Sequence, residues 1–149
     1  MTTYPLIRLT ADGIRDHAQA LAGLLVDTVA GGNSLGFRTT FGPEAAKTWW
    51  LERRDAVAAG ELAVWAADGP HGITGTISLA TSDIPNGRHR GEILKLMVHR
   101  TARGQGLGRV LLATAEAAAA RAGLGLLVLD TVAGTAAERL YLSAGWVRY

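Results

Sequence analysis

The chain has 149 residues, of which 48% are hydrophobic, 19% are charged and none is cysteine. This size and balance predict one globular domain over residues 1–149 and exclude general disorder, disulfide bonds and a cysteine nucleophile. Because 15 basic and 13 acidic residues leave a formal charge of only +2 and the basic ones are dispersed, we expect no nucleic-acid partner. No apolar run is long enough to span a membrane and the N-terminus carries no signal-peptide pattern, so we expect a cytoplasmic protein without a membrane partner.

The N-terminal part of the sequence predicts a strand, two helices and a β-hairpin, in that order. Thr10 can cap the first helix, and Pro43 suits the first turn of the second because its φ is already helical. Turn residues from Asp68 to Gly72 separate the two hairpin strands. The expected elements are the strand Tyr4–Leu9, a helix from Thr10 to Gly31-Gly32, a loop over Asn33–Gly42, a helix from Pro43 to about Ala59, and the strands Glu61–Ala67 and Ile73–Ala80.

The C-terminal part predicts two strand–helix units and a final strand. The expected elements are a polar loop over Thr81–Arg90, the strand Glu92–His99, an Ala-rich helix over Gln105–Ala122, the strand Leu126–Thr131, the helix Thr135–Ala144 and a short strand over Trp146–Tyr149. The resulting order, β-α-α-β-β-β-α-β-α-β, is typical of an α/β or α+β sandwich in which parallel and antiparallel strands mix.

A glycine-rich segment lies between the strand Glu92–His99 and the long Ala-rich helix. Its sequence is Arg103-Gly104-Gln105-Gly106-Leu107-Gly108-Arg109. The glycines let a ligand approach the backbone, and the first-turn N–H groups and dipole of the following helix favour an anion such as phosphate. Arg103 and Arg109 add positive charge that can pair with phosphate oxygens. The segment lacks the Lys-Ser/Thr ending of the nucleotide-triphosphate loop, and its spacing and position differ from the dinucleotide fingerprint, so neither ligand is expected.

The same segment resembles motif A of the GNAT N-acetyltransferase superfamily, Arg/Gln-x-x-Gly-x-Gly/Ala, which Arg103, Gly106 and Gly108 match. The stretch Thr135–Trp146 is similar to the family's later helix, with a tyrosine about four residues before a glycine and an aromatic residue. The resemblance covers most of the chain and is strongest from Glu92 onward. It implies a mixed central sheet with helices on both faces, and acetyl-CoA as the co-substrate. The four histidines show no metal-like spacing with acids, so we expect no metal.

The resemblance also implies how acetyl-CoA is held. The glycine-rich segment binds the pyrophosphate, and the pantetheine lies along the strand as an added strand would. Parallel strands four and five splay apart at their C-terminal ends, and the thioester lies in the gap. The backbone N–H of Met97 or Val98 is the implied donor to the tetrahedral oxyanion. The cofactor-binding residues are therefore expected at Leu96, Met97 and Val98, at all seven positions of Arg103–Arg109, and at Thr135, Glu138 and Tyr141.

Acetyl transfer to an amine needs a base for the amine proton and an acid for the departing thiolate. The resemblance implies Tyr141 as the acid because it puts this hydroxyl near the sulfur; a core tyrosine with a solvated hydroxyl is the alternative. Glu92 and Asp130 are the candidate bases, since each is an acid on an otherwise apolar strand, and strand alternation puts Glu92 on the same face as Leu96. The two acids resemble the proposed base pair of the tabtoxin-resistance acetyltransferases, whose Lys-Leu-Met-Val strand this chain shares at Lys95–Val98. Backbone capping or pairing with arginine is the alternative role for each acid.

Acceptor-binding residues are expected in two places. The segment with Phe37, Arg38 and Phe41 lies where the family builds its acceptor wall, unless it is only a loop. The adjacent Trp49 and Trp50 lie about 100° apart on a helix, so at most one faces the core directly. We assign Trp49 to a substrate pocket, with core burial as the alternative.

We therefore expect an N-acetyltransferase that moves an acetyl group from acetyl-CoA to a primary amine of a small molecule by direct attack. The tabtoxin-resistance likeness points to an antibiotic or toxin. A protein N-terminal or lysine acetyltransferase and a non-catalytic acyl-CoA-binding module are the alternatives. The family's sheet usually continues after the strand that begins near Trp146, whereas this chain stops at Tyr149. The sequence is then truncated, or its sheet has an open edge, or a partner supplies the strand, as in a homodimer that exchanges strands.

Overall fold

The computed structural model describes residues 5–30, 42–69, 72–81, 90–129 and 135–148. The strands are β1 (Leu6–Leu9), β2 (Leu62–Gly69), β3 (Gly72–Thr81), β4 (Arg90–Val98) and β5 (Leu126–Val128). The helices are α1 (Ala11–Asp16), α2 (Ala18–Ala30), α3 (Pro43–Leu51), α4 (Arg54–Ala58), α5 (Leu107–Arg121) and α6 (Ala136–Ser143), and the 3-10 turn η2 (Arg100–Ala102) follows β4.

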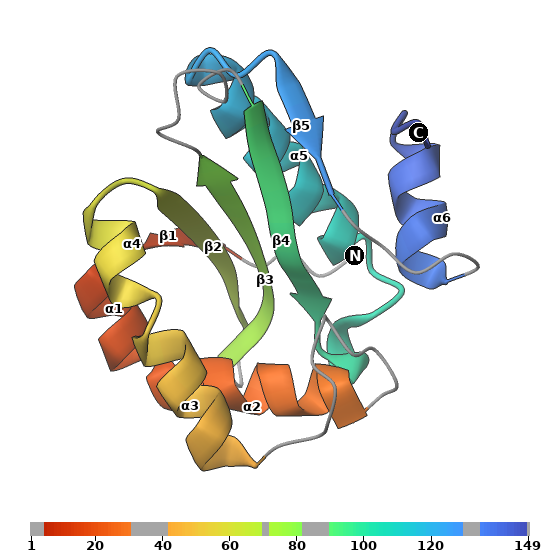
Figure 1. Ribbon diagram of the computed structural model, residues 1–149. Helices are drawn as coiled ribbons and strands as arrows, with labels where there is room; N and C mark the ends of the chain where they lie inside the picture. The colour runs from red at the N-terminus through yellow and green to blue at the C-terminus, as the bar shows by residue number, and fades with distance from the viewer. Residues whose placement is uncertain (1–4, 31–41, 70–71, 82–89, 130–134, 149) are drawn as a thin grey trace.

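The strands form one sheet in the order β1-β2-β3-β4-β5. Strands β1 to β4 are antiparallel neighbours, whereas β5 runs parallel to β4. In Figure 1, α1 to α4 lie on one side of the sheet, α5 lies on the other side, and α6 stands beyond the β5 edge. This arrangement confirms the predicted α/β architecture, a mixed sheet with helices on both faces.

Each face of the sheet has its own hydrophobic core. Helices α1 to α3 bury Ile14, Leu21 and Trp50 on one face, and α5 buries Leu111 and Leu112 on the other. All five side chains are 0% exposed. Strand β4 contributes to both cores, because successive side chains of a strand point to opposite faces. The strand that carries several candidate site residues is therefore held between two packed layers.

Each of the two helices expected in the N-terminal part is divided into two. The first breaks at His17, whose φ of −105° and ψ of 12° lie outside the helical region and whose N–H closes α1 on Gly13 O at 3.0 Å. The second breaks after Leu51, whose carbonyl accepts from Arg54 Nε at 3.0 Å, a side-chain donor where a continuous helix would use a backbone N–H. The single helices predicted over residues 10–31 and 43–59 were wrong in this respect.

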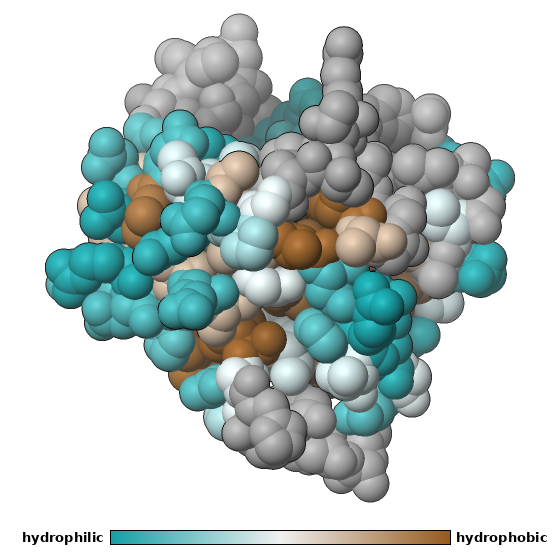
Figure 2. Space-filling view, turned by 90° about the horizontal axis from the view of Figure 1, so that it is seen from below, coloured by the Kyte–Doolittle hydropathy of each residue, from teal (hydrophilic) through white to brown (hydrophobic). Residues whose placement is uncertain are grey.

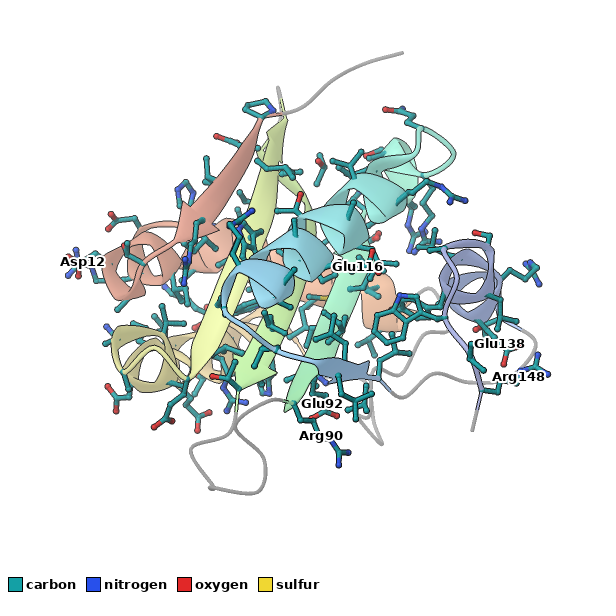
Figure 3. The ribbon with its side chains drawn as sticks, turned by 90° about the horizontal axis from the view of Figure 1, so that it is seen from above. Asp12, Arg90, Glu92, Glu116, Glu138 and Arg148 are labelled. Carbon is teal, nitrogen blue, oxygen red and sulfur yellow. The ribbon has the colours of Figure 1, made fainter. Side chains whose placement is uncertain are left out.

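The expected final strand is also wrong over the described residues, Trp146–Arg148, which form no strand. Helix α6 ends in a Schellman motif, in which Gly145 has a φ of +95° and Trp146 N donates to Tyr141 O at 3.0 Å. The tail then turns back along α6, where Arg148 Nη2 donates to Glu138 Oε1 at 3.0 Å (Figure 3). Strand β5 is shorter than expected and ends at Val128.

Candidate functional site

The parallel strands β4 and β5 are paired over only three residues of each. Arg90, Gly91 and Glu92 face Leu126, Leu127 and Val128, and within the described part of the chain the pairing stops there. Strand β4 continues to Val98 beside β3, so its other edge from Ile93 to Val98 has no strand partner among the described residues. The pairing stops where β5 ends, so the expected splaying of these two strands stays a prediction. An extended ligand could pair with that edge as an added strand.

A bulge at Lys95 divides β4 into two halves. Lys95 has a φ of +50°, and the pairing with β3 shifts between Thr76 and Ser78. Leu94 borders Trp49 and Trp50 on the α3 side, whereas Leu96 packs into the core of α5. The prediction that Glu92 and Leu96 share a face was wrong, because the extra residue of a bulge reverses the alternation that follows it.

Beyond the bulge, the direction of the backbone groups can be worked out from one hydrogen bond. His99 N donates to Thr74 O of β3 at 2.8 Å. Since successive N–H groups of a strand point to opposite sides, the N–H of Val98 points away from β3 toward the unpaired edge, and that of Met97 points to β3. The Val98 carbonyl is consistent with this direction, because it accepts a hydrogen bond from Arg103 Nε at 3.1 Å rather than from β3. Of the two candidate oxyanion donors, Val98 is therefore the one that faces the gap.

The glycine-rich segment leads from this strand end into α5. Gly104 and Gly106 have φ values of +79° and +80°, which favour glycine, and a Cβ at either position would meet no atom within 4 Å. Gly106 is the N-cap of α5, so the N–H groups of the first turn are exposed to a ligand. Gln105 Oε1 is buried, and among the residues that the structure describes it accepts no hydrogen bond. Backbone N–H groups at a helix start with open space before them can hold an anion.

Helix α6 packs directly on the start of α5. A Cβ at Gly108 would lie 3.2 Å from Leu140 Cδ2 and 3.8 Å from Val98 Cγ2, so β4, α5 and α6 converge at this glycine. Arg109 Nη2 donates to Ser143 Oγ at 2.9 Å, which ties α5 to α6. The guanidinium of Arg109 is thus engaged by a neutral acceptor of the protein.

The other α6 residues assigned to the cofactor hold the helix in place. Thr135 is its N-cap and its hydroxyl accepts from Glu138 N at 3.2 Å. The Glu138 carboxylate, which is only 12% exposed, pairs with Arg148. Both residues therefore have structural partners, and their predicted contact with a cofactor stays a prediction.

Tyr141 lies on the side of α6 that faces α5 and β5. It is 8% exposed, and its ring centroid lies 6.0 Å from that of Trp146. Burial raises the pKa of its hydroxyl to about 12, so the group is protonated at neutral pH. Tyr141 also borders a groove of about 1050 Å³ whose opposite wall is the run Leu126–Leu129. A buried, protonated hydroxyl on this side of the sheet can act as a proton donor.

Glu92 lies near the start of β4, at the last residue pair that joins β4 to β5 (Figure 3). Its side chain is half-buried, and its carboxylate is close enough to Lys95 to act electrostatically on the ammonium group. Strand alternation places Glu92 on the same side of the sheet as Leu94, which borders the α3 side, whereas Tyr141 lies in the α5 core. The other candidate base, Asp130, lies outside the described residues, as do Phe37, Arg38 and Phe41.

Next to the bulge lies a pocket of about 250 Å³, which we call the tryptophan pocket. Trp49 lines it, half-buried and packed against the core on this face, with Arg53 Cζ 4.5 Å and Lys95 Nζ 5.6 Å from its ring centroid. Its predicted contact with a substrate stays a prediction. The lining residues are Trp49, Trp50, Arg53, Leu62, Ser78, Leu94 and Lys95. Two cations therefore share one indole ring.

Sequence reasoning assigned no role to Arg53 and did not single out Lys95 for one. Lys95 could have been noticed as the one charged residue in the run Ile93–Val98. Arg53 follows Trp49 by four residues, a spacing that brings side chains together on a helix. Their meeting across 42 residues of sequence (95 − 53) depends on the fold.

An ion-paired cluster fixes the start of the connection from β4 to α5. Asp27 of α2 is 12% exposed; its carboxylate lies 2.6 Å from Arg100 Nε and 3.5 Å from His99 Nε2. The contacts join the layer of α2 to η2, three residues before the glycine-rich segment.

The described residues include no group of three or more histidines, aspartates or glutamates that could hold a metal ion. None of the helices in the described part of the chain has the length and hydropathy that a membrane span requires.

The end of the molecule at which β4 stops is seen in Figure 2. Apolar side chains are exposed near the middle of this end, with hydrophilic side chains on either side.

Comparison with known proteins gives a consistent result. A family model described as the acetyltransferase (GNAT) family matches residues 32–146. A GCN5-related N-acetyltransferase of Ralstonia eutropha is 22% identical, with a TM-score of 0.72 over 99% of this chain and 94% of that one. A "predicted acetyltransferase" of Clostridium acetobutylicum, solved with acetyl-CoA, is 15% identical, with a TM-score of 0.74 over 99% and 92%. A ribosomal-protein-alanine N-acetyltransferase of Brucella melitensis is 26% identical, with a TM-score of 0.74 over 95% and 83%.

Proposed function

The chain belongs to the GNAT acetyltransferase family, and from this premise we propose that it transfers the acetyl group of acetyl-CoA to a primary amine of a small molecule. The observation that carries the proposal is the junction of β4 and α5. There, an edge of β4 that has no strand partner within the described part of the chain is followed, after η2, by a glycine-rich helix start.

The residues at this junction fit acetyl-CoA. The open space at Gly104 and Gly106 admits a phosphate to the first-turn N–H groups of α5. Arg103, which is exposed, adds positive charge beside them. The edge of β4 up to Val98 offers backbone donors and acceptors to the pantetheine amides. When bound, acetyl-CoA supplies an acetyl group activated as a thioester.

We assign the proton transfers to groups on the two sides of the sheet. Glu92, near the point where β4 and β5 part, takes the proton of the acceptor amine, directly or through water. Tyr141 holds a proton for the thiolate, and its burial keeps that proton in place at neutral pH. The N–H of Val98 donates to the oxygen on which negative charge develops. Asp130 stays a candidate partner of Glu92 in the base.

The tryptophan pocket favours a small acceptor over a protein. It holds about 250 Å³ and is lined by two indole rings, a size that suits a small molecule better than a peptide. The likeness to a ribosomal-protein-alanine N-acetyltransferase is the observation that favours a protein N-terminus as the second candidate. An antibiotic or toxin acceptor is the narrower form of the first proposal.

The test is an acetylation assay that follows CoA release with a thiol reagent, over a panel of small primary amines and of peptides with free N-termini. We expect release with a subset of the small amines, and about a 10²–10⁴-fold lower kcat in Glu92→Gln, because a positioned base contributes that factor. Glu61→Gln, which changes an exposed acid outside the described pockets, serves as the matched control. Turnover with peptides alone would favour the second candidate, and no turnover with any amine would contradict both.

A further inference from the structure

The polar groups of the tryptophan pocket are mainly hydrogen-bond donors. Arg53 contributes a guanidinium, Lys95 an ammonium and Trp50 an indole N–H, and none of these groups can accept a hydrogen bond. The remaining polar side chain is the hydroxyl of Ser78, which can do either. A polar ligand that binds in such a pocket has to bring acceptors.

The indole N–H of Trp50 points to the same conclusion independently. Trp50 is 0% exposed, and among the described residues no acceptor lies within hydrogen-bond distance of its Nε1. A buried donor without an acceptor destabilises the folded chain, because its hydrogen bond to water is lost and not replaced. A ligand oxygen in the pocket could accept this hydrogen bond, which would explain why the donor has no acceptor among the described residues.

The two cations are held close together. Both lie over the ring of Trp49, and the charge of Arg53, after the larger effect of burial, lowers the pKa of Lys95. The charge of Glu92, on the N-terminal side of the bulge, acts in the opposite direction with the smallest of the three effects. An anion placed between Arg53 and Lys95 would relieve their repulsion, and the partial burial of both side chains would strengthen the two contacts.

We infer that the tryptophan pocket binds the carboxylate of the acceptor, so that the acceptor of the proposed reaction is an amine that also carries a carboxylic acid. A carboxylate presents two acceptor oxygens to the guanidinium, the ammonium and the indole N–H. The apolar walls made by Leu62, Leu94 and the indoles fit a short carbon skeleton between acid and amine. Lys95 and Glu92 are three residues apart on β4, so an acid held at Lys95 brings the same molecule close to the proposed base.

The assignment of the substrate class rests on the proposed function, whereas the carboxylate site does not. The pocket is therefore tested first by binding alone. The probe is benzoate, with benzamide as its uncharged counterpart, titrated into the full chain while the indole N–H resonance of Trp50 is followed by NMR. We expect a saturable shift with benzoate and at least tenfold weaker binding of benzamide. Arg53→Gln and Lys95→Gln should each weaken benzoate at least tenfold, whereas Lys47→Gln, which removes an exposed cation from the same helix as Trp49, should not.

Other results of this titration overturn the inference. No shift with benzoate, equal affinity for benzamide, or equal effects of Arg53→Gln and Lys47→Gln would each do so. Inorganic phosphate is titrated as well, and tighter binding of phosphate than of benzoate would overturn the assignment to a carboxylate. The wild-type titrations need no variant, so they decide the matter even if Lys95→Gln fails to fold.

The substrate class is tested within the amine panel by comparing 4-(aminomethyl)benzoate with 4-(aminomethyl)benzamide, and 4-aminobutyrate with its amide. We expect the best acceptors of the panel to carry a carboxylate, with a preference in kcat/KM of at least tenfold over the amide that is lost in Arg53→Gln. Turnover in which the best acceptor lacks an acid would overturn the substrate class while the proposed function stands. No turnover with any amine, together with a saturable benzoate shift, would instead contradict the proposed function, whereas the assignment of an anion-binding site would still stand.

Discussion

Two glycines with the same backbone strain separate the binding role of the glycine-rich segment from its structural role. Gly106 at the start of α5 has a φ of +80°, and Gly123 just after its end has a φ of +79°. A Cβ at either position would meet no atom within 4 Å. Alanine at either position therefore adds strain without a clash, about 1–2 kcal/mol for an L-residue in this conformation. In a domain of this size that loss lowers the Tm by roughly 2–8 °C.

The two variants should differ only in acetyl-CoA binding. At Gly106 the added methyl stands in front of the first-turn N–H groups, where the proposed phosphate approaches the backbone, so we expect at least a tenfold loss of affinity, about 1.4 kcal/mol. Gly123 closes the far end of the helix, where Leu124 N donates to Ala119 O at 3.0 Å. Its alanine variant should bind acetyl-CoA like the wild type despite a similar loss in Tm. Thermal unfolding and calorimetry measure the two effects, and equal affinities in the two variants would refute the reasoning.

Three further results are expected. Tyr141→Phe should lower kcat by about 10²–10⁴-fold with acetyl-CoA affinity unchanged in calorimetry, because only the proposed proton donor is lost; an unchanged kcat would remove Tyr141 from the mechanism. Burial raises the pKa of Tyr141 from 10.0 to about 12, so as the pH rises this tyrosine ionises in the unfolded chain before it ionises in the folded one. The free energy of unfolding, measured by urea titration, should therefore keep the full contribution of this group below pH 10 and fall as the pH rises from 10 toward 12. The fall should be shallower in Tyr141→Phe. Asp27→Asn breaks the ion pair with Arg100 and should lower the free energy of unfolding by about 0.5–1 kcal/mol in urea titrations, whereas Asp12→Asn, which removes a surface pair with Arg15, should have a smaller effect.

The sequence predicted those features whose causes are local. The strand, glycine loop and long helix from Glu92 to Ala122 follow from periodicity and from glycine at positions that need a positive φ. The split of α3 from α4 does not, because it depends on Arg54 capping the carbonyl of Leu51, one of several conformations open to that side chain. The Schellman end of α6 had a readable signal in Gly145, and the expectation of a following strand outweighed it.

The site was predictable in part for a similar reason. The segments that form it were identified from the sequence. The bulge at Lys95, however, reverses the faces of the residues after it, and the alternation of Leu94 and Leu96 in the sequence carries no signal of a bulge. The tryptophan pocket joins α3 to β4, so its cations become neighbours only when the sheet and the helix layer pack. The roles of Glu92, Tyr141 and the glycine-rich segment stay predictions that the experiments above decide.

The proposed function requires that the junction of β4 and α5 binds acetyl-CoA. Calorimetric titration of the 149-residue chain with acetyl-CoA, with ATP and NADH as controls, tests it most directly. We predict saturable binding of acetyl-CoA with one molecule per chain and no comparable binding of ATP or NADH. Absence of acetyl-CoA binding, or equal binding of all three ligands, would contradict the account.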